Sequence, residues 1–484
     1  MRCDARSGSD NGQPASDQTS NLNRREWLAT TVAGTLLAGT TGQAAPPNRP
    51  ESKIGSDIAP LRRVLVHEPG SETRKALTLL AQEHPFEAID LIGPEAGTQH
   101  QQFVRLLETS GTRVVRVLDL LNEAITAARA AGELQPWVAE VFPKLVDEAD
   151  ALTGEAVIGA DSRLVFPPSR PGEGSSPLVQ PLKFLLYTRD LGTMTPSGLV
   201  VSNLGMASRD PELALFRFML TWAPSLTDCP VVFDAALEEL QLQGGDVIVA
   251  DPQTLLVGVG NLTSEQAASR LAERLEMDVI AVSLPGPLIG GRGRRNSNRP
   301  LRTTFLHLDT IFSLVDTRTV LAVPYFLESA HSGRDPFSAL VKGLVRAGTI
   351  DPATGAETLN QVKQIGTIRR YLAGTGELDP LLKEKKLLDY VRARDYKVVP
   401  VGGPTEGREP AEHLVENVLH ELRFQAANVV AVKPGVVIAA EANRRTNDAL
   451  KDAGVKVQSF AASELVRWHG GAHCMTLPLS RSEF

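Results

Sequence analysis

The sequence predicts a mixed α/β fold that repeats one unit of two strands, a helix and a third strand. Beyond about Pro60, short β-rich runs alternate with amphipathic helical stretches, and two distant segments show the same order of elements. The length supports such a fold, because 484 residues of which 42% are hydrophobic can bury a large core.

The repeated unit is read from residues 244–284 and 428–465. In the first segment an apolar run, Val247–Ala250, is followed by a turn at Asp251-Pro252 and a second apolar run, Leu255–Val259. A helix then begins at Thr263-Ser264, and the third strand is Asp278–Leu284. In the second segment the first apolar run is Val429–Val432, the turn is Lys433-Pro434-Gly435 and the second run is Val436–Ala440. The helix is Thr446–Ala453, and the third strand is Val455–Phe460. One such unit cannot cover its own apolar face, so we expect several units around a centre, with their inner ends at one pocket.

A helical period replaces the strand pattern between Val117 and about Ala160. Its two apolar faces are Leu120, Leu121, Ala124, Ile125 and Ala128, and then Trp137, Val138, Val141, Phe142 and Leu145. We therefore expect a helical insert over about 117–160. It would belong to one domain over 61–484, which follows a linker rich in Pro, Gly and Ser over 46–60.

The charge balance restricts the partners. Fifty Lys and Arg against 57 Asp and Glu give a net charge of −7, which argues against nucleic acid or an anionic membrane and favours a small neutral or cationic ligand. No apolar run outside the N-terminal segment approaches the ~18–20 residues that span a bilayer, so no stable membrane insertion is expected. The oligomeric state stays open, a homo-oligomer included.

The first 45 residues have the features of an export signal. Asn23-Arg24-Arg25-Glu26 precedes a weakly apolar stretch from Leu28 to Leu37, and Gly42-Gln43-Ala44-Ala45 supplies a small-residue cleavage site. This order predicts a twin-arginine signal peptide over 1–45, and hence a protein of the periplasm or another compartment outside the cytoplasm.

Four short segments concentrate polar groups beside apolar strands: Tyr187–Asp190, Gln243–Asp246, His307–Thr310 and Gly470–Thr476. Alternation along a strand would place the side chains of His307 and Asp309 on one face. Cys474 follows two glycines, where backbone can approach a ligand closely. Together with a histidine it forms a candidate thiolate nucleophile with an acid/base partner.

Each segment also has a purely structural interpretation. A His-x-Asp sequence on a strand is often a satisfied pair, and a free cysteine is often a small buried hydrophobe. Tyr187–Asp190 could end a strand in a salt bridge, and Gly244-Gly245 could form a bulge. Cys474 could pair with Cys229 after export, although three cysteines in the chain make no disulfide framework.

Taken together and in this order, the segments resemble the arginine deiminase branch of the guanidino-group-modifying, or pentein, superfamily. The resemblance extends from Leu61–His67 through Asn428 and Lys433-Pro434-Gly435, and through Asn443 and Thr446-Asn447, to Gly470–Arg481. It implies a five-fold pseudosymmetric α/β propeller of ββαβ units with an added helical bundle and an active centre on the axis.

The resemblance also implies the chemistry. Cys474 would attack the carbon of a guanidinium or similar group, and His307 would pass a proton to the departing amine and then activate water. Asp190 and Asp309 would hold the substrate nitrogens. No metal and no other cofactor is expected, because Cys and His serve as nucleophile and base and the histidines lack zinc-ligand spacing.

The resemblance places Gln243, Arg189, Arg209, Tyr187 and His469 around a small guanidino or ureido substrate, and several of these positions depart from the family pattern. Gln243 stands where a Glu is usual. Phe184, Leu262 and His469 replace an Asn and two Arg residues that grip the amino-acid part of arginine, and only Arg209 matches. An arginine-rich loop, Arg292–Arg302, could supply another anion clamp or be a solvated loop. These changes weaken the case for free arginine as the substrate.

The function predicted from the sequence is a Cys-dependent hydrolase of a guanidino or ureido C–N bond, acting through a covalent thiouronium-type intermediate. Two alternatives remain: an amidinotransferase of the same superfamily, which hands the amidino group to an amine, and a binding protein that keeps the pocket without turnover.

Overall fold

The computed structural model describes residues 53–70, 72–73, 95–159, 182, 184–205, 209–284, 306–331 and 335–482. The chain divides into two units, Met1–Thr41 and Gly42–Phe484, and every residue described here belongs to the second. The predicted signal peptide over 1–45 and the arginine-rich loop over 292–302 lie outside the described residues. Within the described ranges, no helix is long and apolar enough to cross a membrane.

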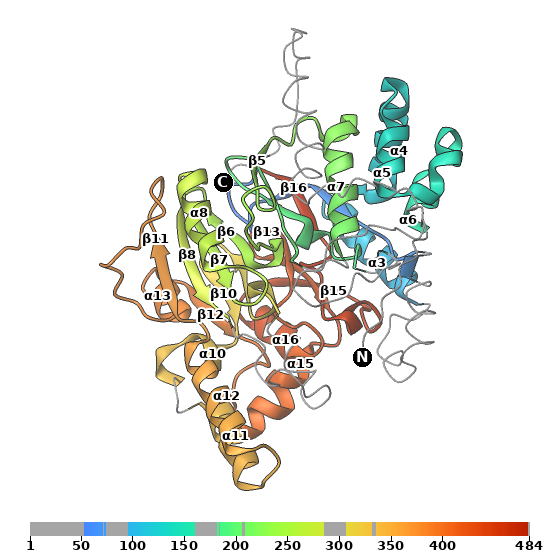
Figure 1. Ribbon diagram of the computed structural model, residues 1–484. Helices are drawn as coiled ribbons and strands as arrows, with labels where there is room; N and C mark the ends of the chain where they lie inside the picture. Colours follow the sequence, from blue (N-terminus) through green and yellow to red (C-terminus); the bar gives the residue numbers. More distant parts are fainter. Residues whose placement is uncertain are drawn as a thin grey trace, which may run out of the picture. The chain divides into compact units, whose positions relative to one another are not determined.

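The described strands form five small mixed sheets (Figure 1). In each sheet a first strand pairs antiparallel with a second, and the second pairs parallel with a third. In that order the triplets are β3 (Gly192–Met194), β4 (Leu199–Val201) and β5 (Val231–Asp234); β6 (Val247–Asp251), β7 (Thr254–Val259) and β8 (Asp278–Ser283); β9 (Phe312–Asp316), β10 (Thr319–Ala322) and β12 (Lys397–Pro400); β13 (Val430–Lys433), β14 (Val436–Ala440) and β15 (Lys456–Phe460); and β16 (Leu477–Arg481), β1 (Leu61–Val66) and β2 (Arg113–Arg116).

The last of these triplets joins the two ends of the described chain. β16 lies near the carboxyl terminus, yet it supplies the first strand of the sheet that contains β1 and β2. The other four sheets take their triplets in chain order, and β11 (Ile368–Tyr371) adds a fourth strand beside β8. The repeated unit that the sequence predicts at 244–284 and 428–465 is confirmed in both places.

A helix connects the second and third strand of each unit. These connecting helices are α3 (Ala96–Thr109), α7 (Asp210–Trp222), α8 (Glu265–Leu275) and α16 (Arg444–Asp452), while the unit of β9, β10 and β12 carries α10 (Pro324–Leu327), α11 (Pro336–Arg346), α12 (Pro352–Gln364) and α13 (Leu387–Arg392). α8 begins after Ser264, whose hydroxyl accepts the N–H of Ala267, as the sequence signal predicts.

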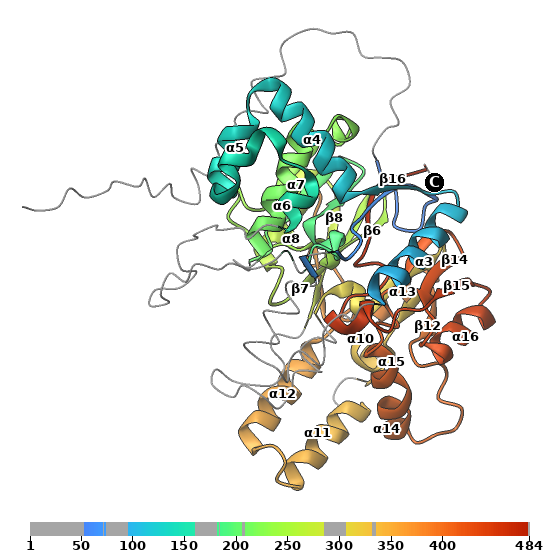
Figure 2. The same cartoon turned by 90° about the vertical axis from the view of Figure 1, so that its right-hand side faces the viewer.

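The helical region after β2 has the faces that its period predicts. It comprises α4 (Val117–Ala131), α5 (Leu134–Val141), a 3₁₀ segment at Pro143–Ala151 and α6 (Gly154–Gly159), which lie beside α7 in Figure 2. The buried side chains of α4 include all five predicted residues of its face. Trp137 of α5 stacks on Phe218 of α7 with ring centroids 3.8 Å apart. Apolar burial thus holds these helices to the α7 unit.

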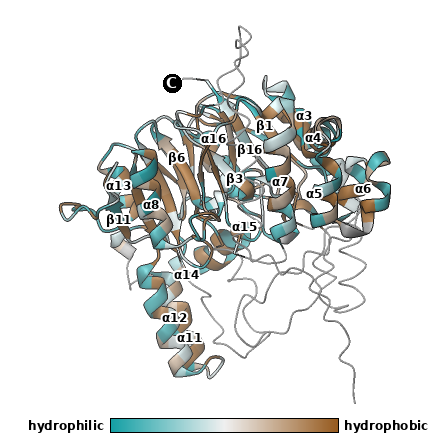
Figure 3. Ribbon diagram, turned by 45° about the horizontal axis from the view of Figure 1, so that its top comes forward, coloured by the Kyte–Doolittle hydropathy of each residue, from teal (hydrophilic) through white to brown (hydrophobic). Residues whose placement is uncertain are grey.

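The predicted linker is wrong at its carboxyl end. Ile54, Ile58 and Ala59 are buried, and Asp57 accepts hydrogen bonds from Arg189 and from the backbone N–H of Val249. Residues 53–60 therefore pack into the core, because their apolar side chains outweigh the Pro, Gly and Ser content that suggested a linker. Strand β6 is mostly apolar, and it is coloured brown in Figure 3.

Candidate active site

The four polar segments meet where the first strands of four units begin. Thr188–Leu191, Gly244–Asp246 and Leu308–Thr310 are single 3₁₀ turns directly before β3, β6 and β9, and Cys474 lies shortly before β16. Because the units repeat one architecture, the same pre-strand position of each unit reaches a common centre. A ring nitrogen of His307, a carboxylate oxygen of Asp309 and the sulfur of Cys474 all lie within 4.8 Å of one another.

His307 and Asp309 share the site for a different reason from the predicted one. They do not lie on a strand: His307 is extended, and Leu308–Thr310 turns as a 3₁₀ helix before β9. The hydroxyl of Thr310 donates to the carbonyl of His307 at 2.6 Å and fixes this turn. A side chain at Gly245 would place its Cβ 2.8 Å from Nδ1 of His307, so glycine is required there for the imidazole to fit.

The thiol of Cys474 is buried between polar partners. Its side chain is 3% exposed, its Sγ donates to Oδ2 of Asp309 at 3.4 Å, and Nδ2 of Asn428 donates to the sulfur at 3.1 Å. Burial raises the pKa of this thiol well above its usual value, and the carboxylates of Asp309 and Asp190 raise it further. The side chain of Cys474 is therefore a protonated thiol at neutral pH.

A second imidazole, His473, holds Asp309. Nδ1 of His473 donates to Oδ2 of Asp309 at 2.8 Å, and both side chains are buried. Burial acts to raise the pKa of Asp309, but His473 and His307 outweigh it and lower that pKa below its usual value. Sequence reasoning missed His473; its place beside Cys474 in a polar segment was the available signal.

His307 lies between an amide and carboxylates. Its Nε2 donates to Oε1 of Gln243 at 2.7 Å, and its Nδ1 lies 3.9 Å from Oδ1 of Asp190. Burial acts to lower the pKa of His307, but Asp190, Asp246 and Asp309 together raise it above its usual value. The cationic form, which can give a proton to a departing amine, is therefore favoured in this site.

Arg209 ties Asp190 to the start of α7. Its guanidinium donates to Oδ2 of Asp190 at 2.7 Å and lies 2.8 Å from Oε2 of Glu212, and the ring of Phe184 lies 5.4 Å from its central carbon. Burial disfavours the charged guanidinium, yet Glu212 and Asp190 together raise the pKa of Arg209. Glu212 is fully buried and was not predicted; its only signal was an acidic residue in the first turn of a helix.

Two carboxylate oxygens in this site have no hydrogen-bond partner. They are Oδ1 of Asp190 and Oδ1 of Asp309, both buried. A buried carboxylate oxygen without a donor carries a desolvation penalty, which a ligand with several N–H groups would relieve. A planar guanidinium offers such donors in a fixed geometry.

Comparison with known proteins agrees with this geometry. The model of the family described as "Arginine deiminase" matches residues 172–337 and 383–481, more than half of the chain, including all four polar segments. The chain belongs to the arginine deiminase family. Arginine deiminase of Metamycoplasma hominis is 27% identical over 449 residues, which cover 89% of this chain and 96% of that protein.

A second relative and one solved structure have lower sequence identity to this chain. Arginine deiminase of Mycobacterium tuberculosis (strain H37Rv) is 26% identical over 456 residues, covering 88% of this chain and 97% of that protein. The structure of an amidinotransferase from Microseira wollei has a TM-score of 0.47 and 13% identity, covering 90% of this chain and 98% of that one. A structural likeness of this size adds nothing to the family assignment.

Two of the predicted substrate-binding residues of this chain form hydrogen bonds with other parts of the protein. Arg189 is fully buried and donates to the carbonyls of Gly244 and Val247 as well as to Asp57. The hydroxyl of Tyr187 donates to the carbonyl of Leu465 at 2.9 Å. The prediction of substrate contacts for these two side chains is therefore not supported by where their polar groups point.

The remaining predictions for the pocket have mixed outcomes. Gln243 and Arg209 lie in the site, while His469 is half-buried in a left-handed conformation at the end of a 3₁₀ turn. Leu262 is half-buried beside Thr263, which bonds Asp246. Cys229 and Cys474 are both free thiols, so the disulfide that the sequence left open is not formed.

Three side chains of the site also form a set that could hold a metal ion. His307, Asp309 and Cys474 offer an imidazole, a carboxylate and a thiolate, the ligand types that zinc accepts. A metal ion there would occupy the sulfur of Cys474, the candidate nucleophile. We therefore predict that dialysis against a strong chelator changes kcat/KM by less than about twofold; a loss of activity restored by zinc alone would contradict this.

Asp246 gives the site a testable pH dependence. Burial raises the pKa of its carboxyl from 3.8 to about 7, although Thr263 and the N–H of Leu308 donate to it. A raised pKa means that the folded state holds this proton more tightly than the unfolded state. The contribution of Asp246 to the free energy of unfolding is therefore complete below about pH 4, and it is lost as the pH rises to about 7.

The matched variant for this effect is Asp246→Asn. Urea denaturation of both proteins should show that only the wild type loses roughly 4 kcal/mol of unfolding free energy across this pH range, beyond the changes that the two share. Parallel pH profiles of the two proteins would show that folding does not raise the pKa of Asp246.

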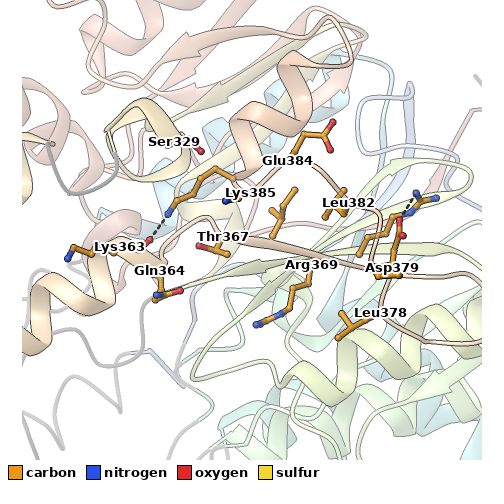
Figure 4. A pocket seen from close by; sticks show the side chains of 14 residues that line it. Ser329, Lys363, Gln364, Thr367, Arg369, Leu378, Asp379, Leu382, Glu384 and Lys385 are labelled. Carbon is orange, nitrogen blue, oxygen red and sulfur yellow. Dashed lines mark hydrogen bonds and ion pairs between the residues drawn. The ribbon is translucent and has the colours of Figure 1, made fainter.

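A large cavity lies outside this site. Its volume is about 780 Å³, and its wall includes Lys363, Arg369, Asp379 and Lys385 (Figure 4). None of the predicted site residues lines it. The neighbouring Lys386 is buried, and its ammonium donates to the carbonyls of Lys363 and Ile365, so this lysine caps the end of α12.

Proposed function

We propose that this enzyme of the arginine deiminase family hydrolyses a C–N bond of a guanidino or ureido compound through a covalent intermediate on Cys474. The observation that carries the proposal is the pair of unpartnered carboxylate oxygens on Asp190 and Asp309, which lie in one buried site with a thiol and an imidazole. This arrangement supplies a nucleophile, a proton carrier and two acceptors for a planar cation.

The substrate itself helps to form the nucleophile. The thiol pKa is raised by burial and by two carboxylates, so a cation bound to those carboxylates offsets their negative field. The thiol proton passes to solvent, the sulfur forms a bond to the guanidinium carbon, and the π electron pair of the C=N bond moves onto nitrogen. A positively charged substrate is therefore favoured over a neutral one at the first step.

The two halves of the reaction use the same imidazole. In the first, the carbon–nitrogen bond breaks, the departing amine takes a proton from His307 and leaves as ammonia, and a thiouronium-type adduct remains on Cys474. In the second, His307 takes a proton from water, the oxygen bonds to the carbon and the carbon–sulfur bond breaks. The departing sulfur takes the remaining hydroxyl proton of the product, so the thiol and the cationic His307 are restored, and the products are ammonia and a urea-type compound.

The direct test is a product assay over a panel of substrates. The purified protein is incubated with arginine, agmatine, methylated arginines and citrulline, and ammonia and urea-type products are measured. Stoichiometric release of both from at least one compound is expected. Transfer of the amidino group to an added amine, without urea-type product, would favour the amidinotransferase, and binding without turnover would favour the binding protein.

Gln243→Glu tests the charge that distinguishes this site. Oε1 of Gln243 accepts from His307 and its Nε2 donates to the carbonyl of Leu204 at 2.8 Å. A carboxylate there adds a negative charge, and since charged hydrogen bonds are stronger by about 1 kcal/mol, KM for arginine should fall about fivefold. The lost donor to Leu204 should cost about 1–3 kcal/mol of stability in the same variant. An unchanged KM in a folded variant would show that Gln243 does not face the substrate.

Two wider expectations stay proposals. We propose that the five sheets close into the five-bladed propeller of the pentein superfamily, because each has the same strand order and β16 joins the two ends of the chain. Export through the twin-arginine route is the second proposal, and fractionation of cells that express the full chain, with and without Arg24-Arg25→Lys-Lys, would test it.

A further inference from the structure

The unit of β13, β14 and β15 also contributes a residue to the candidate active site. In four units the segment directly before the first strand supplies Asp190, Asp246, Asp309 or Cys474. In the fifth, Asn428 occupies this position before β13. It is 1% exposed and lies against Cys474.

The carboxamide of Asn428 is used completely around the nucleophile. Oδ1 accepts the backbone N–H groups of Gly471 at 3.1 Å and Cys474 at 3.0 Å. Nδ2 donates to the sulfur of Cys474 at 3.1 Å and to the carbonyl of Asp309 at 3.2 Å. One planar group thus fixes the backbone that carries the nucleophile, the nucleophile itself and the turn that carries Asp309.

The backbone beside Cys474 is shaped for this contact. A Cβ at Gly471 would lie 2.8 Å from Oδ1, 2.9 Å from Cβ and 2.9 Å from the carbonyl oxygen of Asn428. Any side chain at position 471 would therefore push Asn428 away. The glycine allows the amide to reach the N–H of Cys474 and the sulfur at the same time.

The donor on the sulfur has an electrostatic consequence. Asp309 and Asp190 disfavour a negative sulfur, whereas an N–H aimed at the sulfur stabilises the thiolate more than the thiol. The sulfur accepts from Nδ2 of Asn428 and donates to Asp309, and the backbone of Gly471, which Asn428 itself holds, also lowers the pKa of the thiol. We infer that Asn428 is a positioning residue that orients Cys474 and makes its thiol more acidic, an inference that rests on the proposed function of Cys474.

A purely structural role is the rival explanation, because three of the four hydrogen bonds go to backbone groups. The two explanations differ in what they predict for ionisation. Loss of a structural tie lowers stability, whereas loss of the donor on the sulfur shifts the pH at which the thiolate appears. Asn443 provides a matched control: it is also 1% exposed, and its Nδ2 donates to the carbonyl of Phe424 at 2.8 Å.

The experiment titrates the thiol in Asn428→Asp, Asn428→Ser and Asn443→Asp. The ultraviolet absorbance of the thiolate is followed against pH, with Cys474→Ser subtracted so that Cys3 and Cys229 cancel, and alkylation by iodoacetamide is timed in parallel. Asp keeps the acceptor of Asn428 and replaces the donor by a negative oxygen, while Ser removes the carboxamide and leaves a shorter hydroxyl. Thermal unfolding of each variant shows whether it is folded.

We expect both Asn428 variants to shift thiolate formation to higher pH and to slow alkylation at neutral pH by about tenfold. Raising the pH should restore the wild-type rate, and Asn443→Asp should change it by less than about twofold. Folded Asn428 variants that titrate as the wild type does would overturn the inference. So would failure of both to fold while Asn443→Asp folds. Because no substrate is needed, an inactive wild type would defeat the proposed function and leave this titration valid.

Discussion

Replacement of Cys474 by Ala removes turnover of every guanidino or ureido substrate, with a loss in kcat of at least about 10³-fold. The hydrogen bonds of this side chain to Asp309 and Asn428 both use the sulfur, so the substitution deletes the nucleophile while the backbone N–H of Cys474 can still bond Asn428. Steady-state assays of ammonia release and a thermal unfolding curve measure both parts of this expectation.

Cys229→Ala is the matched control for this loss. Cys229 is a second buried free thiol, but its sulfur contacts Arg63 and Asp228 rather than the site. We expect its kcat to stay within about twofold of the wild type, because distant sites act independently. Turnover that survives in Cys474→Ala, or that disappears equally in both variants, would remove Cys474 from the mechanism.

His307→Gln should have the second largest effect, a fall in kcat of about 10²–10⁴-fold, since general acid/base groups contribute this much. Gln can still hydrogen-bond Gln243 but neither gives up nor takes a proton at neutral pH. The pKa of His307 is raised by the surrounding carboxylates, so activity in the wild type should decline as the pH rises through that raised pKa. The variant should lose this limb of the pH profile.

The control for the imidazole is His413→Gln. His413 bonds the hydroxyl of Tyr325 and the carbonyl of Gly403 and makes no described contact with the site. Its pH profile should match that of the wild type. A pH profile unchanged in His307→Gln would show that another group carries the proton.

The sequence predicted what repeats and what is periodic. The buried face of α4 and the order of β6, β7, α8 and β8 follow from apolar spacing, turn residues and the cap at Ser264, which are local properties. The convergence of Cys474, His307, Asp190 and Asp309 followed from the resemblance of short segments to a family. Neither kind of evidence reports how a side chain is used once the chain is folded.

Local sequence patterns could not predict which distant partners these side chains bond. Arg189 and Tyr187 are adjacent to Asp190 in sequence, but their hydrogen bonds go to Asp57, Gly244 and Leu465, which no local pattern connects to them. His473 gains its role from the carboxylate of Asp309, which another unit supplies. Glu212 gains its role from the guanidinium of Arg209, three residues before it, which in turn bonds Asp190.

The prediction that His307 and Asp309 lie on a strand was wrong because the local backbone forms a turn. His307-Leu308-Asp309 alternates in polarity as a strand does, yet its polar groups serve a 3₁₀ turn, whose carbonyl at His307 is bonded by Thr310. A short polar segment next to a strand fits both conformations. Only the position of β9, which begins at Phe312, decides between them.

Mass spectrometry of the acid-quenched enzyme tests the central claim most directly. The protein is mixed with a compound that it turns over, quenched within the first turnovers and digested. We predict an amidino-type adduct on the peptide that contains Cys474, which disappears on longer incubation and is absent from Cys474→Ala. Product that accumulates while this peptide stays unmodified, or an adduct on another residue, would contradict the account.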